Sequence, residues 1–387
     1  MSTKQQTEKI DMNIQFVFPY GDTGRMHPAY MMHPEELYDK LNEMVSQKLM
    51  IRIESSVTDQ KDHTYILFHY TAQCEYSHKW NKYSLCGRSI VFRKHNSGKI
   101  EIITPGLLKR FEASIQINTS TLIKELRGVP VLVTEKMDGQ YVCVVVLENG
   151  YPLITSARTF DGNVVTEVRA YMTEHNIFPK MIPRLIYIFE HVKSQVICKY
   201  DSVRHGMYLI TVIEPTGRIV DRPELEKYAT SIGTFIVPIR NFTDITEVLD
   251  WSNSINNGYL TTEGVVVEFP NGFGCKVKTP LYYAIMKEKQ FLDDKYIKQY
   301  IFDGVLPSFR MEENKKTFLA KSEEILKQLF DLMKPICEFI NAHTNEKDTD
   351  LVRQAIAQKI HKKFIGFIKN RDISEKAIRS MTYIVLK

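Results

Sequence analysis

The sequence lacks the features that would assign it at once to several large classes of protein. Its six cysteines include no Cys-x-x-Cys pair, which favours reduced thiols of an intracellular protein over a disulfide framework or a zinc site. No apolar run approaches the roughly 18 residues that span a bilayer. The polar residues 1–12 contain no apolar signal core. No Gly-x-x-x-x-Gly-Lys-Ser/Thr motif occurs, which argues against a P-loop kinase.

What the sequence does contain is an ordinary globular composition. Its 387 residues are 43% hydrophobic and 25% charged, which is enough for two domains with apolar cores. The net charge of +5 makes the chain mildly basic. This charge permits a polyanionic partner without requiring one.

One short stretch, Lys136-x-Asp138-Gly139, stands between two apolar runs, 129–133 and 141–147. The second run is followed by Asn149-Gly150, a pair typical of tight hairpins. A lysine held at the edge of buried strands can serve as a nucleophile if positive neighbours or burial favour loss of its proton. The alternative is a surface lysine beside an Asp-Gly turn, and the tetrapeptide alone does not decide between them.

Charged residues recur at the ends of other strand-like segments. The chain alternates like strands over residues 49–68 and 84–103, with Arg88 near the start of the second segment. Lys109 follows a turn, and Arg158 ends the strand after the hairpin. Arg88 and Lys109 could also be solvated surface charges. Glu190 interrupts an apolar run, where it is costly unless it is paired or lies on an exposed edge.

A second hairpin is predicted over residues 262–278, with a Pro-Asn-Gly turn. Lys276 and Lys278 are two residues apart, so a strand turns both toward the same face. Glu263 begins the facing strand and can place a carboxylate near that face. Two lysines with a carboxylate opposite suit a phosphate and metal site, although a plain charged sheet face would have the same pattern.

The apolar period becomes helical from about residue 290 onward. Helices are expected over residues 318–336 and 351–368, and a last one is expected after Ser374. The end of the chain, residues 351–387, is rich in lysine and arginine. Such an end is either a solvated helical face or a surface that follows a nucleic-acid backbone.

Taken together, the motifs resemble the covalent nucleotidyltransferases, which include DNA ligases, RNA ligases and mRNA capping enzymes. In chain order they are Arg88-Ser89-Ile90-Val91-Phe92, Lys109-Arg110-Phe111, Lys136-x-Asp138-Gly139, Phe189-Glu190, Glu263-Gly264-Val265-Val266 and Lys276-Val277-Lys278. The two motifs that precede Lys136 are similar to those of the RNA ligase 1 family of T-even phages. The resemblance covers residues 84–285. It departs at Ser89, where the family has glycine, and near Gln195, where the family has an arginine.

The resemblance implies that Lys136 attacks the α-phosphate of ATP to form lysyl-AMP, and that the AMP then passes to an RNA 5′-phosphate. It implies that Lys276, Lys278 and Glu263 serve in catalysis. The implied nucleotide-binding residues are Arg88 and Lys109 on the β- and γ-phosphates, Val266 on the adenine, Glu190 on the ribose, and Glu135, Asp138, Gly139 and Arg158. It also implies Mg²⁺, or Mn²⁺ in its place, at Glu190 and Glu263, directly or through water.

We therefore expect an α+β fold, with a nucleotidyltransferase domain of packed antiparallel sheets and helices over residues 1–290. An all-α domain is expected over residues 291–387. The expected partners are ATP and RNA with 5′-phosphate and 3′-OH ends, and no membrane. A soluble intracellular monomer is expected, cytoplasmic, nuclear or viral. The alternatives are a capping guanylyltransferase, a DNA ligase, or a catalytically inactive RNA-binding protein.

Overall fold

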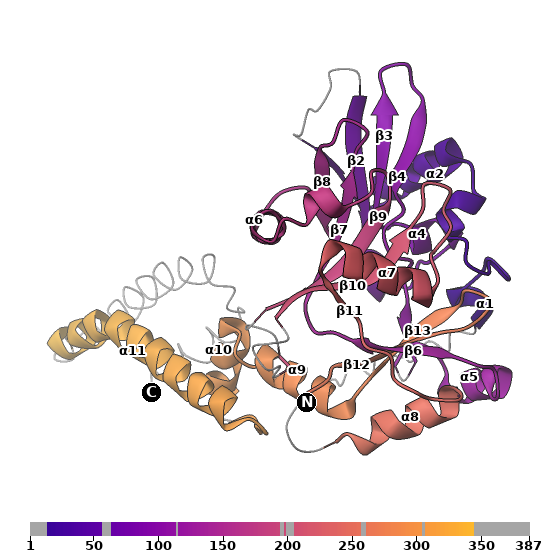
Figure 1. Cartoon of the computed structure of the whole chain (residues 1–387). Coiled ribbons are helices and arrows are strands. Elements are labelled where there is room, and N and C mark those ends of the chain that lie inside the picture. Colours follow the sequence, from indigo (N-terminus) through magenta and orange to yellow (C-terminus); the bar gives the residue numbers. More distant parts are fainter. Residues whose placement is uncertain are drawn as a thin grey trace. The chain divides into compact units, whose positions relative to one another are not determined.

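The structure is a computed structural model that describes residues 14–55, 63–113, 115–193, 197–198, 205–256, 261–303 and 306–343. The chain divides into two compact units, Met1–Tyr282 and Tyr283–Lys387 (Figure 1). The first unit holds three sheets with helices, and the described part of the second is helical. Helix α9 (Pro280–Gln290) runs across this division, whereas the sequence-based prediction placed the boundary after residue 290.

The first sheet is an antiparallel meander in the order β1-β2-β3-β4. Its strands are β1 (Met50–Glu54), β2 (His63–Tyr70), β3 (Arg88–His95) and β4 (Ile100–Thr104). Helix α2 (Pro34–Ser46) packs on β1 and β4. Its buried side chains join those of β2 and β3 in one apolar core.

The connection between β2 and β3 corrects the sequence-based strand prediction. The predicted strand began at residue 84, but α4 (Lys82–Cys86) occupies its start and β3 begins only at Arg88. The side chain of Asn81 accepts hydrogen bonds from the N–H groups of Tyr83 and Ser84, and Ser84 accepts one from Asn81. This reciprocal cap starts a helix where alternation alone suggested a strand. A second short helix, α3 (Ala72–Tyr76), precedes it.

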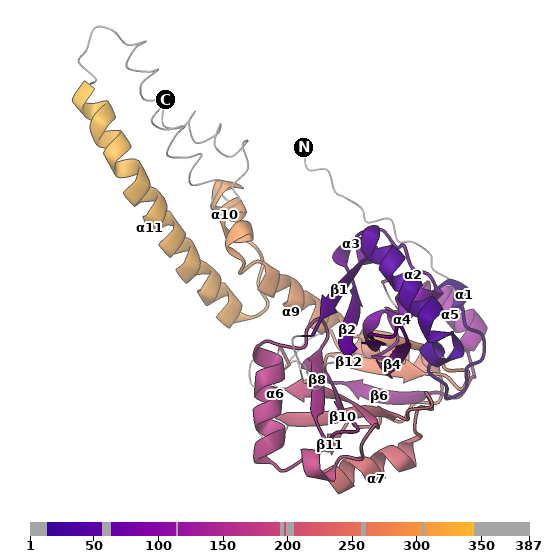
Figure 2. The ribbon, with the colours of Figure 1, turned by 90° about the horizontal axis from the view of Figure 1, so that it is seen from above.

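The second sheet has the order β11-β10-β9-β7-β8. Its elements are β7 (Gln140–Val146), β8 (Pro152–Ser156), β9 (Ile186–Val192), β10 (Gly206–Ile213) and β11 (Phe235–Ile236). The predicted hairpin is confirmed as β7 and β8, with Gly150 at a φ of 82° in its turn. Helices α6 (Asn163–Glu174) and α7 (Arg222–Ile232) contact this sheet, as Figure 2 shows. A short turn of helix, η2 (Phe178–Lys180), precedes β9.

The third sheet carries the second predicted hairpin and has the order β5-β13-β12-β6. Its strands are β5 (Phe111–Glu112), β6 (Leu132–Lys136), β12 (Gly264–Glu268) and β13 (Gly274–Lys278). One face packs its apolar side chains into a core shared with α5 (Thr119–Leu126) and α8 (Ile245–Ser254). Because side chains alternate along a strand, the other face presents Lys136, Val266, Lys276 and Lys278.

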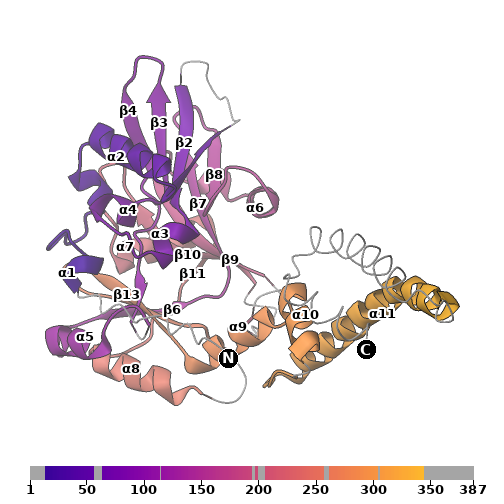
Figure 3. The ribbon, with the colours of Figure 1, turned by 180° about the vertical axis from the view of Figure 1, so that it is seen from behind.

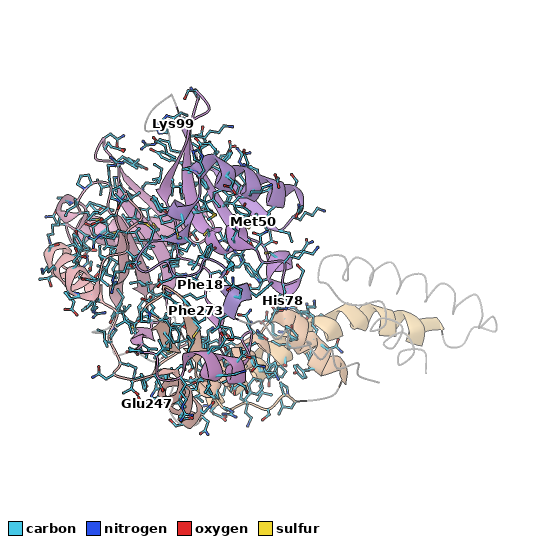
Figure 4. All side chains as sticks on the ribbon, turned by 90° about the vertical axis from the view of Figure 1, so that its right-hand side faces the viewer. Phe18, Met50, His78, Lys99, Glu247 and Phe273 are labelled. Carbon is cyan, nitrogen blue, oxygen red and sulfur yellow. The ribbon has the colours of Figure 1, made fainter. Side chains whose placement is uncertain are left out.

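The N-terminal segment joins the second and third sheets. It includes α1 (Ile14–Val17) and the turn η1 (Pro28–Met31). Figure 4 labels Phe18 and Phe273, whose ring centroids are 5.8 Å apart. Farther on, the backbone N–H of Thr23 donates to Asn271, and the carbonyl of Arg25 accepts from Ile219. The segment therefore crosses from the turn of the third sheet to the loop after β10.

The predicted α+β class is confirmed. Most strand pairs are antiparallel, as predicted, but the two-residue strands β5 and β11 pair parallel with β13 and β10. In the second unit, α10 (Asp294–Asp303) contacts α11 (Glu312–His343), as Figure 3 shows. The helices predicted over 351–368 and after Ser374 lie outside the described residues. Of the helices that are described, none is long and apolar enough to cross a bilayer.

Candidate active site

The Lys-x-Asp-Gly motif connects two different sheets. Lys136 ends β6 in the third sheet, and Gln140 begins β7 in the second. The loop between them packs on β9. A Cβ atom on Gly139 would lie 2.6 Å from the carbonyl oxygen of His191 and 2.9 Å from Cγ of Glu190. The absence of a side chain at Gly139 therefore allows the loop to approach β9 this closely.

The carboxylate of Asp138 holds this loop in place. It accepts hydrogen bonds from the backbone N–H groups of Ile197 (2.6 Å) and Cys198 (2.9 Å). It also accepts one from the hydroxyl of Tyr282 (3.2 Å). Hydrogen bonds to an ionised carboxylate are stronger than those between neutral groups. Asp138 therefore fixes the position from which Lys136 projects.

Lys136 belongs to a chain of ion pairs on the third sheet. Its Nζ lies 2.6 Å from Oε2 of Glu263, whose Oε1 lies 3.1 Å from Nζ of Lys278. Lys278 also lies 3.1 Å from Glu112 on β5. Burial alone would lower the pKa of Lys278, but the two carboxylates outweigh it and raise that pKa above its usual value. The predicted meeting of Glu263 with the lysine face is confirmed.

Lys276 has very different surroundings although it lies on the same strand face. Neither Lys276 nor Arg88 has an ion-pair partner among the residues that the structure describes. Burial lowers the pKa of Lys276 well below its usual value, and the charges of Arg88, Lys136 and Lys109 lower it further against the opposing effect of Glu112. Cations that repel one another in a half-buried place form a site for an anion.

Glu190 brings a carboxylate to the same place from β9, where it pairs with Tyr141 of β7. Burial raises its pKa to about 7. The charges of Lys136 and Arg88 oppose this rise, whereas those of Glu263 and Asp138 add to it. Burial is thus the main cause of the raised pKa of Glu190, and the two cations nearby offset it only in part.

These groups border one cavity between the second and third sheets. Six predicted residues line it: Arg88, Glu135, Lys136, Glu190, Val266 and Lys276. Val266 pairs with Thr134 on one side and with Lys276 on the other. The lining continues along the sheet to Leu132 and Glu268. An apolar side chain beside a row of cations suits a ligand with a flat apolar ring and a charged group.

Three predicted residues differ from the expected arrangement. Glu135 borders the cavity, but it precedes Lys136 on β6, so its side chain points to the opposite face of the sheet, where its carboxylate lies 3.6 Å from Arg240. Arg158 is exposed in the loop after β8. Lys109 is buried and paired with Glu75 at 2.6 Å, and it does not line the cavity.

Sequence reasoning missed Glu112, Glu75 and the role of Tyr282. Glu112 comes directly after the Lys109-Arg110-Phe111 segment, but β5 is too short to carry a periodic pattern. Its parallel pairing with β13, which aligns it with Lys276, appears only in the folded chain. A signal was present for Tyr282, which follows Lys278 by four residues at the start of a helix.

A divalent cation was expected at Glu190 and Glu263. Both oxygens of Glu263 are engaged by lysines, so Glu263 offers no open ligand in this arrangement. Glu190 forms no ion pair among the described residues, and it borders the cavity. Over the same residues, no group of three or more His, Cys, Asp or Glu side chains could hold a metal ion. Magnesium commonly binds one carboxylate together with waters and ligand phosphates, and Glu190 fits that role.

No protein-family model matches the chain, and no curated protein sequence matches it. Solved structures do resemble it. Two forms of an archaeal ATP-dependent RNA ligase align with TM-scores of 0.47 and 0.46 at 16% and 17% identity, over 76% and 79% of this chain and 79% and 83% of theirs. A variant of the Naegleria gruberi RNA ligase with ATP and Mn has a TM-score of 0.36 at 10% identity, over 62% of this chain and 98% of its own. Likenesses of this size do not transfer an activity, so the chemistry has to come from the side chains described above.

Proposed function

We propose that this chain is an ATP-dependent RNA ligase that joins 5′-phosphate and 3′-OH ends through lysyl-AMP and RNA-adenylate intermediates. The observation that carries the proposal is that Lys136, paired with Glu263, lines one cavity with two cations, Lys276 and Arg88, that form no ion pair with any described residue. A nucleophilic side chain beside uncompensated positive charge suits a reaction at a phosphate. The order of the motifs along the chain supports the narrower choice of a ligase.

In the proposed first step, the α-phosphate of ATP lies beside Lys276, whose positive charge offsets the charge that develops on the phosphate. The amine of Lys136 forms a bond to phosphorus, and the bond from phosphorus to the leaving pyrophosphate breaks in line with it. Lys136 must first lose a proton. Oε2 of Glu263, at 2.6 Å, is an acceptor within hydrogen-bond reach.

The rest of the nucleotide would follow the sheet away from Lys136. Val266, which is next to Lys276 across the ladder, would pack on the adenine. Glu190 on the opposite wall would bind a ribose hydroxyl or a water on the metal. Bound Mg²⁺ or Mn²⁺ would neutralise negative charge on the phosphate oxygens. Arg88 would pair with the β- and γ-phosphates and orient the leaving group.

The later steps use the same phosphate site. The RNA 5′-phosphate displaces Lys136 from the AMP, which forms RNA-adenylate and returns the lysine to the neutral amine. The 3′-OH of a second RNA end then attacks that 5′-phosphate and releases AMP. Lys136 is not a nucleophile in this last step, whereas Lys276 still faces a reacting phosphate. RNA repair is the role that we propose for such joining.

The test is to incubate the purified protein with α-labelled ATP and magnesium, and then to separate it on a denaturing gel. Label that stays on the protein, and that hydroxylamine or acid but not alkali removes, is expected for a lysyl phosphoramidate. Lys48→Ala is a matched control, because Lys48 is an exposed lysine outside the site. RNA with a 5′-phosphate and a 3′-OH should then be joined.

Each other outcome favours one alternative. Label from GTP in preference to ATP would indicate a capping guanylyltransferase. Joining of DNA ends but not of RNA ends would indicate a DNA ligase. Retention of RNA without label from either nucleotide would indicate a catalytically inactive RNA-binding protein. The monomeric state and the compartment remain predictions.

A further inference from the structure

Lys109 is enclosed by aromatic rings. Its Nζ lies 4.7 Å from the ring centroid of Tyr70, 5.0 Å from that of Trp80 and 5.4 Å from that of Phe111. The Trp80 ring meets both of the other rings edge to face. Only 4% of the lysine side chain is exposed. Aromatic faces attract an ammonium group, so this aromatic cage of Tyr70, Trp80 and Phe111 holds the cation firmly in one place.

The fourth side of the aromatic cage is closed by the carboxylate of Glu75. Its Oε1 lies 2.6 Å from Nζ of Lys109, and the hydroxyl of Tyr70 lies 3.4 Å from the same atom. In contrast to the lysine, the Glu75 side chain is 38% exposed. It also belongs to α3, a helix of five residues. The cation is therefore fixed, and its anionic partner is the member of the pair that can leave.

The caged lysine lies next to the anion site. The residues that follow it by two and three positions, Phe111 and Glu112, form β5 and pair with Cys275 and Lys276 of β13. The positive charge of Lys109 is close enough to contribute to the lowered pKa of Lys276. An anion that is bound at Lys276 and Arg88, and that is longer than one phosphate group, would therefore extend toward Lys109.

We propose that Glu75 is an exchangeable counter-ion for Lys109, which a terminal phosphate of the nucleotide, or released pyrophosphate, displaces. This inference rests on the proposed function. An anionic partner stabilises a buried ammonium group, and either a carboxylate or a phosphate oxygen can take that role at Lys109. With nucleotide bound, the phosphate takes the place and Glu75 turns to solvent. When pyrophosphate leaves, Glu75 returns and competes with its rebinding, which favours the forward direction of the first step.

The direct test is a calorimetric titration of the full chain with magnesium pyrophosphate, which needs no catalysis. Glu75→Gln removes the competing charge and should bind pyrophosphate about tenfold more tightly, the size expected for one charge-assisted contact. Glu75→Asp keeps the charge and should stay near the wild type. Glu43→Gln is the matched control, because Glu43 pairs with Lys40 on an exposed face of α2.

Pyrophosphate should also raise the melting temperature of Glu75→Gln more than that of the wild type, because it restores the missing partner of Lys109. This second measurement covers the case in which the variant is less stable alone. Equal pyrophosphate affinity in Glu75→Gln and wild type would overturn the proposal and leave Lys109 as a structural tether of α3. Absence of lysyl-AMP in the wild type, with the affinity change present, would refute the proposed function but not the exchange.

Discussion

The surroundings of Lys278 and those of Lys276 differ more than two positions on one strand face would suggest. Lys278 lies between two carboxylates, Glu263 and Glu112, and its pKa is raised above the usual value. Lys276 faces the cavity with Arg88 and Lys136 nearby, and its pKa is lowered well below the usual value. In the first region, around Lys278, carboxylates of the protein balance the positive charge. In the second region, around Lys276 and Arg88, they do not.

We infer from this difference that the charges around Lys278 stabilise the fold, whereas those around Lys276 bind an anionic ligand. A balanced buried network loses stability when one member is removed, because its partner is left unpaired. An unbalanced group of cations gains stability when one member is removed, but it then loses affinity for its anion. Stability and activity should therefore respond in opposite directions in the two regions, and this contrast can be tested by substitution.

The largest effect is expected at Lys136, which belongs to both regions. Lys136→Ala cannot form the covalent adduct, so labelling by ATP should fall to background. The same variant should still join RNA that already carries a 5′-adenylate, because that step needs no nucleophilic lysine. Joining is measured with pre-adenylylated RNA, and the exposed Lys48→Ala serves as the control. If Lys136→Ala were labelled as well as the wild type, another residue would be the nucleophile.

Substitution of each β13 lysine by methionine compares the two regions most directly. Lys276→Met should slow adenylylation by about 10²–10³-fold, the usual cost of losing one electrostatic contact to the reacting group. It should also raise the melting temperature, because a cation held in an unfavourable place is removed. Lys278→Met should lower the stability by roughly 3 kcal/mol, because Glu263 and Glu112 lose a buried partner.

The lowered pKa of Lys276 also determines how the change in melting temperature of Lys276→Met depends on pH. A lysine whose folded pKa is lowered costs stability at every pH below its usual value of 10.5, and that cost disappears as the pH rises toward 10.5. The gain in melting temperature of Lys276→Met should therefore shrink with rising pH. A loss of stability in Lys276→Met, equal to that in Lys278→Met, would show that both lysines are structural.

The sequence predicted the lysine face correctly because strand geometry is local. Residues two apart on a strand share a face, and the turn residues mark the hairpin, so the sequence alone was enough to group Lys276, Lys278 and Glu263. The position of Lys136 at the edge of buried strands followed from the apolar runs on both sides of it. These inferences need only neighbours in the chain.

The partners of those lysines could not be predicted in the same way. Glu112 reaches Lys278 through a two-residue parallel strand, and Glu75 reaches Lys109 from a helix that the sequence did not reveal. Both pairs join residues far apart in the chain through short elements with no periodic pattern. The opposite pKa shifts of Lys276 and Lys278 depend on residues in these pairs, so the sequence alone could not predict the shifts.

A substitution of Glu190 tests the side of the cavity that β9 forms. Its folded pKa of about 7 exceeds the usual 4.5, so the folded protein binds more protons than the unfolded chain between these values. Stability conferred at low pH is therefore lost as the pH rises toward 7. Above that pH, the buried negative charge of Glu190 costs the wild type stability. Glu190→Gln removes this cost and should stabilise the protein by up to roughly 3 kcal/mol at pH ~8 and hardly at all at pH ~4.5.

The measurement is the difference in melting temperature between Glu190→Gln and the wild type at the two pH values. Glu174→Gln, at an exposed position on α6, is the control for loss of a carboxylate. A stabilisation by Glu190→Gln that is the same at both pH values would contradict a raised pKa at this position.

The smallest effect is expected at Ser89, next to Arg88. Ser89 has a φ of 66°, a conformation that favours glycine. Its hydroxyl donates a 2.7 Å hydrogen bond to the carbonyl oxygen of Ala157, which ties β3 to the end of β8. The strain of about 1 kcal/mol and the bond of about 1 kcal/mol nearly offset each other.

Ser89→Gly should therefore leave the free energy of unfolding within about 0.5 kcal/mol of the wild type, since it relieves the strain and loses the hydrogen bond together. Ser89→Ala keeps the strain and loses only the bond, so it should be less stable than Ser89→Gly by about 1 kcal/mol. Urea unfolding of the three proteins measures both differences. Adenylylation should be unchanged in both variants, because neither alters the charges at Lys276 and Arg88. If Ser89→Ala were instead as stable as the wild type and Ser89→Gly less stable, the hydroxyl would contribute nothing and the backbone at Ser89 would not be strained.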